Sequence, residues 1–359
     1  MLYYLYLLKA SFSPLNVFQY ITFRAAGAFM TALGISFATG PAIIRWLRSK
    51  KAKTVRIDTP AHHQTKAGTP TMGGIIIYLA MVGSALFWAR LQDRFVLLVL
   101  LSSTVLWIIG FVDDYLKSMV HRKDGLSAPV KMTGQLLLAL FVAAYLYMDP
   151  PNIAFATHVS VPYSKEWVQN LGVLYVPFCM MLLVGSSNAV NLADGLDGLA
   201  AGTLVISALT YGVFAYLAGN IRFSQYLRII PVTGAGELTV VVAAMVGACL
   251  GFLWYNCYPA EIFMGDTGSL FLGGVVGLIA LCVKQELLLV IVGGIFVAEA
   301  LSVLAQVYSF RVHKKRIFKM APLHHHFELI GWPESKVTIR FWIVAVVLAL
   351  FALASLKLR

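Results

Sequence analysis

FVLLVLLSSTVLWIIGFVDDYL, residues 95–116, is an apolar run long enough to cross a bilayer as one helix. A hydrocarbon core about 30 Å thick requires roughly 20 such residues. The run ends in two adjacent carboxylates, Asp113 and Asp114, where negative charge opposes the helix dipole. Ionisable groups at a membrane cost free energy and are usually functional, so this pair is a candidate for a functional site. The alternative is a pair of solvated interfacial charges, with Lys117 one turn away as partner.

Nine further segments of this kind accompany the first. Of the 359 residues, 59% are hydrophobic and 12% are charged, whereas a soluble domain carries about 25% charged residues. The sequence therefore predicts an all-α integral membrane protein, one polytopic domain over residues 1–359 built as a bundle of ten transmembrane helices. The predicted spans are 18–44, 72–89, 95–116, 132–148, 171–191, 196–218, 237–256, 268–283, 286–310 and 340–357.

Three smaller features complete this picture. Residues 149–170 contain proline and β-branched residues and predict a small hairpin outside the bilayer. The four cysteines include no CxxC pair and are expected to be reduced, with neither a disulfide nor a metal framework. The N-terminal stretch has no basic region followed by a cleavage site, so no cleaved signal peptide is expected.

The distribution of cations predicts the orientation of the chain. The net charge is +12, and the loops after the first, third and ninth segments hold 18 of the 28 Lys and Arg residues. Such loops are typical of the cytoplasmic side. Cations in short loops set topology and attract anionic ligands or lipid headgroups, which argues against nucleic acid as a partner. We therefore expect a basic cytoplasmic face and both termini outside.

The same face carries four polar clusters on four loops: GFVDDY (110–115), NAVNLADGLDG (188–198), FMGDTGS (263–269) and APLHHHFE (321–328). Individually, Asp194 and Asp266 could be helix caps, and Asp197 a first-turn anion. Asn188 and Asn191 raise the polar density above what capping requires, and they suit a hydrogen-bonding ligand such as a base or a sugar.

Two more loop features point to phosphate. KAGTPTMGG (66–74) resembles a phosphate loop only loosely. Two interpretations are therefore equally favoured: a loop in which Lys66 and Thr71 contact an anion, and an ordinary loop. His324, His325 and His326 lack the spacing of a zinc site. Carboxylates on three loops suit Mg²⁺ bound with a phosphate-bearing substrate, while imidazole and lysine groups suit its oxygen anions.

The motifs TPTMGG, GFVDDY, NAVNLADGLDGLA, GFLWYN, FMGDTGSL and APLHHHFE resemble those of the phospho-N-acetylmuramoyl-pentapeptide-transferase family. This family is a branch of the polyprenyl-phosphate N-acetylhexosamine-1-phosphate transferases. The resemblance keeps order and spacing from about residue 17 to the C-terminus. The PxHHHxE form at 322–328 resembles this branch and differs from the branch that uses UDP-GlcNAc. Ala193 stands where many relatives have Thr, and leaves both neighbouring aspartates in place.

The resemblance implies a ten-helix homodimer in the bacterial cytoplasmic membrane, with its active site on the cytoplasmic face. It implies Mg²⁺-dependent transfer of phospho-MurNAc-pentapeptide from UDP-MurNAc-pentapeptide to undecaprenyl phosphate, giving lipid I and UMP. The implied catalytic residues are Asp113, Asp114, Asp266, Lys131 and His324, with Asp266 as the Mg²⁺ ligand. The implied substrate-binding residues are Lys66, Thr71, Asn188, Asn191, Asp194, Asp197, Phe263, Gln306, His325 and His326.

Alternatives remain at this point. A transporter or flippase for anionic substrates would place its site near the bilayer midplane between broken helices. A sister enzyme would take a different UDP-sugar, and a purely structural subunit would not need so many carboxylates. For the transferase, we expect Asp113 to deprotonate or orient the lipid phosphate for direct attack. A covalent phospho-enzyme is the competing mechanism.

Overall fold

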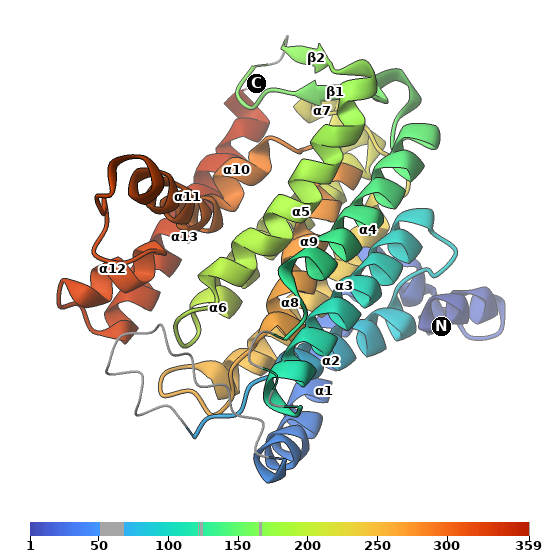
Figure 1. The fold of residues 1–359 in the computed structure, drawn as a ribbon. Helices are drawn as coiled ribbons and strands as arrows, with labels where there is room; N and C mark the ends of the chain where they lie inside the picture. The colour runs from blue at the N-terminus through green and yellow to red at the C-terminus, as the bar shows by residue number, and fades with distance from the viewer. Residues whose placement is uncertain (51–67, 121, 123–124, 165–166, 359) are drawn as a thin grey trace.

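The computed structural model describes residues 1–50, 68–120, 122, 125–164 and 167–358, which form a helical bundle (Figure 1). The ten main helices are α1 (Ile21–Ser49), α2 (Gly74–Trp88), α3 (Arg94–Ser118), α4 (Ala128–Met148), α5 (Tyr175–Ala193), α6 (Leu199–Ala218), α8 (Leu238–Asn256), α9 (Asp266–Cys282), α11 (Gly294–His313) and α13 (Glu334–Leu358). The short ones are α7 (Ile221–Leu227), α10 (Leu288–Val292) and α12 (Leu323–Leu329). The 3₁₀ turns are η1 (Leu2–Ala10), η2 (Ser13–Gln19), η4 (Ile153–Phe155), η5 (Gly172–Leu174) and η6 (Ala235–Glu237).

Every predicted span overlaps one of the main helices, with ends that differ by several residues. Eight helices in the described part of the chain are long and apolar enough to cross a membrane, while α2 and α9 are apolar but shorter. One predicted span is not a single helix. The span predicted as continuous over 286–310 is interrupted at Gly293, where α10 ends and α11 begins. The consecutive glycines 293 and 294 weaken the helix there.

The centre of the bundle is α9, in which all 17 residues are buried. A helix that is apolar on every side favours such a position. Helices α3 and α5 pack along α9, and α1 packs along α8 (Figure 1). Small residues permit close approach, as in membrane bundles generally. At Gly74 and Gly268 the backbones of α2 and α9 are so close that a Cβ on Gly74 would overlap the α9 backbone.

The two ends of the bundle differ in what they carry. The hairpin expected within 149–170 is present as β1 (His158–Ser160) and β2 (Val168–Asn170), antiparallel with Val159 opposite Gln169. It lies at what we call the hairpin end, together with α7 (Figure 1). The opposite end, which we call the carboxylate end, is where α3 and α5 finish and α6 and α9 begin. It brings together the acidic clusters predicted to share one face.

A smaller hydrophobic core lies beside the main one, at the carboxylate end. It is built by apolar side chains from the α5–α6 loop and its following turn, from α11 and from α13: Leu196, Leu199, Ile295, Val337, Phe341 and Ala345. Helices α11 and α12 stand out from the side of the bundle (Figure 1). This second core therefore fastens the C-terminal helices to the loop that carries two of the predicted site aspartates.

Candidate active site

Three carboxylates meet where the end of α3 approaches the start of α9. Asp113 and Asp114 occupy the last turns of α3, and Asp266 is the first residue of α9. One oxygen from each lies within 4.8 Å of the others, and all three residues are buried. The N-terminal end of α9 favours the negative charge of Asp266. The structure therefore brings together three of the residues that the sequence analysis assigned to one site.

Two lysines lie among these carboxylates. Lys131 Nζ donates to Asp266 Oδ2 at 2.5 Å and lies 3.8 Å from Asp113 Oδ2. Lys117 Nζ donates to Asp113 Oδ2 at 2.5 Å and to Asp266 Oδ2 at 3.3 Å. The side chains of Lys117 and Lys131 are 28% and 18% exposed, whereas that of Asp113 is 2% exposed. The lysines therefore form the accessible side of the cluster, and three carboxylates outnumber two cations there.

The remaining hydrogen bonds fix the carboxylates individually. Asn191 Nδ2 donates to Asp266 Oδ1 at 2.6 Å and to Ser269 Oγ at 2.8 Å. Thr267 donates its N–H and its hydroxyl to Asp114 Oδ2, at 2.8 and 2.6 Å. Asp114 thereby joins α3 to the first turn of α9. Asp113, in contrast, receives its other contact from a loop, the Leu126 N–H at 2.8 Å from Oδ1.

Gly265, immediately before Asp266, has a backbone conformation and surroundings that strongly favour glycine. Its φ is +73°, and an added Cβ would lie 2.8 Å from Thr71 Oγ1 and closer still to Asp114 Oδ2. Its N–H donates to Asp194 Oδ2 at 3.1 Å. Thr71 and Asp194 are thus both placed beside the carboxylate cluster.

The donor set suits a hard cation. Carboxylate oxygens are the ligands that Mg²⁺ prefers in proteins. Two ammonium groups already converge on Asp266 Oδ2 and Asp113 Oδ2, which demonstrates that the cluster attracts positive charge. The three carboxylates could therefore hold a metal ion.

The histidines lie in a helix, where a loop was expected. Pro322 precedes α12, in which all three imidazoles fall. The ring of His324 packs against Gly195, where a Cβ would overlap it, and the backbone N–H of His324 donates to Glu299 Oε1 at 3.2 Å. His325 Nδ1 lies 2.8 Å from Glu328 Oε2, and His326 Nδ1 accepts from the Lys319 N–H at 3.2 Å. The loop 194–198 thus brings His324 near the acidic clusters.

Several predicted ligand residues make contacts within the protein. Asp197 is buried, and its Oδ2 accepts from the Ala260 N–H at 3.0 Å. Gln306 Oε1 accepts from the N–H groups of Ile317 and Phe318, both at 3.0 Å. Asn188 Nδ2 donates to Gln135 Oε1 at 2.5 Å. These side chains stabilise loops and helix contacts around the site.

Two predicted residues complete the set. Phe263 is half-buried, and its backbone pairs with Pro70 and Gly73, which places it beside the start of α2. Lys66 lies outside the described residues. Sequence reasoning missed Gln135 and gave Lys117 only a role as a surface partner. The spacing of four residues from Asp113 was the signal that could have placed Lys117 in the cluster.

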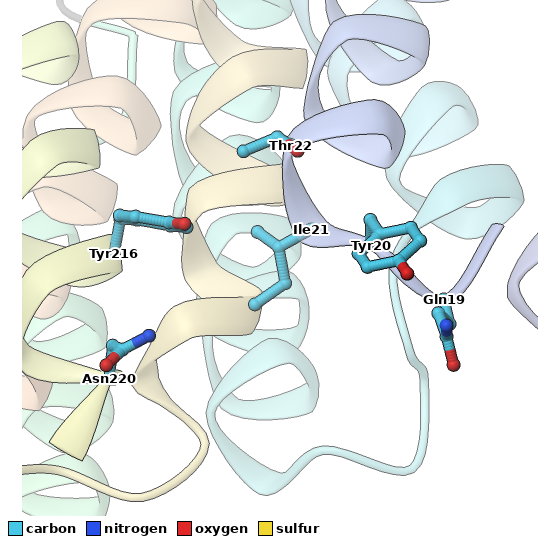
Figure 2. Close-up of a pocket in the computed structure, with 7 residues that line it drawn as sticks. Gln19, Tyr20, Ile21, Thr22, Tyr216 and Asn220 are labelled. Carbon is cyan, nitrogen blue, oxygen red and sulfur yellow. The ribbon is translucent and has the colours of Figure 1, made fainter. Parts of the chain in front are cut away.

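A pocket at the hairpin end provides a contrast (Figure 2). It has a volume of about 260 Å³ and opens between the start of α1 and the end of α6. Its lining residues are Gln19, Tyr20, Ile21, Thr22, Tyr216, Gly219 and Asn220. None of these lining residues is charged, so the pocket does not suit a polyanion.

Comparison with known proteins gives a consistent result. A family model described as glycosyl transferase family 4 matches residues 96–284, and a phospho-N-acetylmuramoyl-pentapeptide-transferase signature matches residues 66–77. Similar proteins with that transferase name include those of Endomicrobium trichonymphae (54% identical) and Citrifermentans bemidjiense (52%), each alignment covering 100% of both chains. That of Thermodesulfovibrio yellowstonii is 49% identical over 99% of both chains. This chain therefore belongs to the phospho-N-acetylmuramoyl-pentapeptide-transferase family.

Proposed function

We propose that the carboxylate–lysine cluster is the catalytic centre of a Mg²⁺-dependent transferase on the cytoplasmic face of the bacterial inner membrane. The reaction is that of the family. Phospho-MurNAc-pentapeptide passes from UDP-MurNAc-pentapeptide to undecaprenyl phosphate, and lipid I and UMP are formed in peptidoglycan synthesis. One observation carries the assignment: three buried carboxylates and two lysines meet at one end of a bundle of membrane-capable helices. There a water-soluble nucleotide and a membrane-anchored phosphate can meet.

The contacts of the two neighbouring aspartates support different roles. Asp114 Oδ2 is taken by both donors of Thr267, so Asp114 positions α9. Asp113 contacts the accessible Lys117 and is the better candidate to accept a proton from the lipid phosphate or to orient it. A lipid phosphate oxygen then bonds to the β-phosphorus of UDP-MurNAc-pentapeptide. The bond from that phosphorus to the bridging oxygen breaks, and UMP leaves.

The lysines and the metal ion would have separate roles in handling the phosphates. Lys131 and Lys117 hold phosphate oxygens and offset the charge brought by two anionic substrates. Mg²⁺ held by Asp266 would stabilise negative charge on the transferred phosphoryl group. Thr71, Asn191, Asp194 and Phe263 surround this centre and would bind the nucleoside, with Lys66 from the adjoining loop. The histidines of α12 would hold the phosphate or amino-sugar portion. Asp197, Gln306 and Asn188 contribute by fixing these segments.

The partners of the protein follow from this assignment. Membrane lipids surround the apolar helices, and the enzyme works as a homodimer with ten spans and both termini outside. The excess of Lys and Arg at the carboxylate end supports the cytoplasmic placement of that end.

The test is an assay of detergent-purified protein with UDP-MurNAc-pentapeptide and undecaprenyl phosphate, with and without Mg²⁺. Release of UMP that requires both substrates and the metal is the expected result. It would exclude a transporter. Faster turnover of UDP-GlcNAc would instead indicate a sister enzyme. UDP-MurNAc-pentapeptide alone should give no burst. A burst of about one UMP per site with a phosphorylated aspartate would establish a covalent mechanism.

A further inference from the structure

One face of α13 lies against the loop 194–198. Glu334, Thr338 and Trp342 are four residues apart and therefore share a helix face. Glu334 Oε1 accepts from the Asp197 N–H at 2.8 Å, and the Thr338 hydroxyl donates to the Asp197 carbonyl at 3.2 Å. The Trp342 indole packs on Gly202, where a Cβ would overlap it. Both backbone groups of Asp197 are thus held by α13.

These contacts are buried. Glu334 is 8% exposed and Thr338 is 6% exposed. Burying a carboxylate costs free energy unless it is hydrogen-bonded, and the N-terminal position of Glu334 in α13 favours its charge. On the adjoining stripe, Val337 and Phe341 pack into the second hydrophobic core with Leu196 of the same loop. The loop is therefore held by hydrogen bonds and by apolar packing at once.

From Asp197, the contacts continue to the carboxylate cluster. The Asp197 carboxylate accepts from the Ala260 N–H, in the segment that leads to Phe263. At the other end of the loop, Asp194 accepts from the Gly265 N–H, next to Asp266. The loop 194–198 is thus joined to α13 through Asp197, and to the segment 260–265 beside the proposed nucleoside site through both Asp197 and Asp194.

We propose that Glu334 and Thr338 are positioning residues for the reaction, which fix the loop 194–198 and so set the affinity for the UDP-sugar. The inference rests on the proposed function. Helix α13 packs mainly on α6, α10, α11 and α12, whereas Asp113 and the two lysines belong to α3 and α4. Loss of a contact from α13 should therefore weaken binding of UDP-MurNAc-pentapeptide and leave the undecaprenyl phosphate side unchanged.

The experiment compares removal and conservation of each hydrogen bond. Glu334→Ala and Thr338→Val should each raise the KM for UDP-MurNAc-pentapeptide on the order of ten-fold, the size expected for one lost buried hydrogen bond. The KM for undecaprenyl phosphate should stay unchanged. Glu334→Gln keeps an acceptor and Thr338→Ser keeps the hydroxyl, so both should restore most of the wild-type KM. Ser335→Ala, at an exposed position in the same turn, is the matched control.

The outcomes separate this inference from the proposed function. Unchanged KM values in Glu334→Ala and Thr338→Val, or equal rises for both substrates, would overturn the positioning role. So would failure of the conservative variants to restore the KM. If Glu334→Ala does not fold, the KM values of Thr338→Val and Thr338→Ser for UDP-MurNAc-pentapeptide decide whether the positioning role holds. A wild-type protein that makes no lipid I contradicts the proposed function instead. Calorimetric titration with UDP-MurNAc-pentapeptide then tests the positioning role without turnover.

Discussion

Two clusters of buried charge lie at opposite ends of the bundle. At the hairpin end, Lys284 Nζ lies 3.1 Å from Glu286 Oε1, and the Tyr175 hydroxyl donates to the same oxygen at 2.9 Å. Both charged side chains are 0% exposed and pair one to one. At the carboxylate end, Asp113 and Asp266 pair with two lysines that solvent can reach, and Asp114 lies beside them as a third carboxylate. A buried ion pair with equal numbers of positive and negative groups can have a purely structural role. A solvent-accessible cluster with an excess of carboxylates can instead replace its internal contacts by contacts to a ligand.

The closed pair has a visible structural task. Lys284 Nζ also donates to the Ala156 carbonyl at 3.3 Å, and the Ser160 hydroxyl donates to the Lys284 carbonyl at 3.5 Å. Both partners belong to the segment that forms the hairpin. The cluster therefore holds the hairpin on the junction between α9 and α10.

The largest expected effect is on folding, at the hairpin end. Lys284→Met leaves Glu286 buried without its cation and should lower the free energy of unfolding by about 3–5 kcal/mol. Unfolding in detergent titrated with SDS measures the loss, and turnover per folded molecule should be unchanged. The double variant Lys284→Met with Glu286→Gln should recover part of the stability. A drop in turnover per folded molecule would show that the two ends are coupled.

The second effect is on catalysis, at the carboxylate end. Asp266→Asn should lower the rate about 10²–10³-fold, the range for removal of one strong electrostatic contact in an active site, because an amide is a poorer ligand for a hard cation. UMP release with titrated Mg²⁺ measures it, with the unfolding midpoint as control. Near-normal, Mg²⁺-dependent turnover would reduce Asp266 to a helix cap.

A third, smaller effect distinguishes the two lysines. Lys131→Met removes the ammonium group 2.5 Å from Asp266 and should lower kcat/KM about 10–100-fold, as for a charge-assisted hydrogen bond. Because Lys117 remains near Asp266, the fold should survive. Steady-state kinetics and a thermal melt report both quantities. A loss of stability as large as that of Lys284→Met would remove the distinction between the two ends.

The smallest effect is expected for an exposed pair. Arg94 forms a salt bridge with Asp149, and its hydrogen bond lowers the pKa of that carboxyl. Because the pKa of this carboxyl is lower in the folded state, the ion pair stabilises the fold at pH values above the ordinary carboxyl pKa of about 4. This contribution is lost as the pH falls below that value. The side chain of Asp149 is 55% exposed, so Arg94→Ala should cost less than about 1 kcal/mol. Thermal melts of the wild type and of Arg94→Ala at neutral and acidic pH measure both the cost and its pH dependence. A larger cost at neutral pH would show that burial does not explain the difference between this pair and the pair Lys284–Glu286.

Sequence reasoning located the helices and the acidic clusters because long apolar runs and charge segregation are properties of the chain itself. It did not find the break at Gly293, since apolar residues continue on both sides. The sequence analysis did not single out Lys284, because its burial depends on contacts with Ala156 and Tyr175, which lie far from it in the sequence. Likewise, nothing in the sequence shows whether Asp197 and Gln306 face a ligand or a backbone N–H. Those distinctions arise from packing.

Gly265 has a consequence for the evolution of resistance. Any side chain at this position would displace Asp114 and Thr71, and its positive φ is strained for other residues. A competing ligand that drew its affinity from the Gly265 backbone would therefore contact a position that the chain cannot change without disturbing its own carboxylates. A substitution of Phe263 keeps its backbone hydrogen bonds with Pro70 and Gly73, so contacts made only to this side chain are easier for the protein to lose, although the substitution also removes a ring proposed to bind the nucleoside. Resistance to an antibacterial compound that binds at the carboxylate end should therefore arise more slowly if the compound contacts the Gly265 backbone.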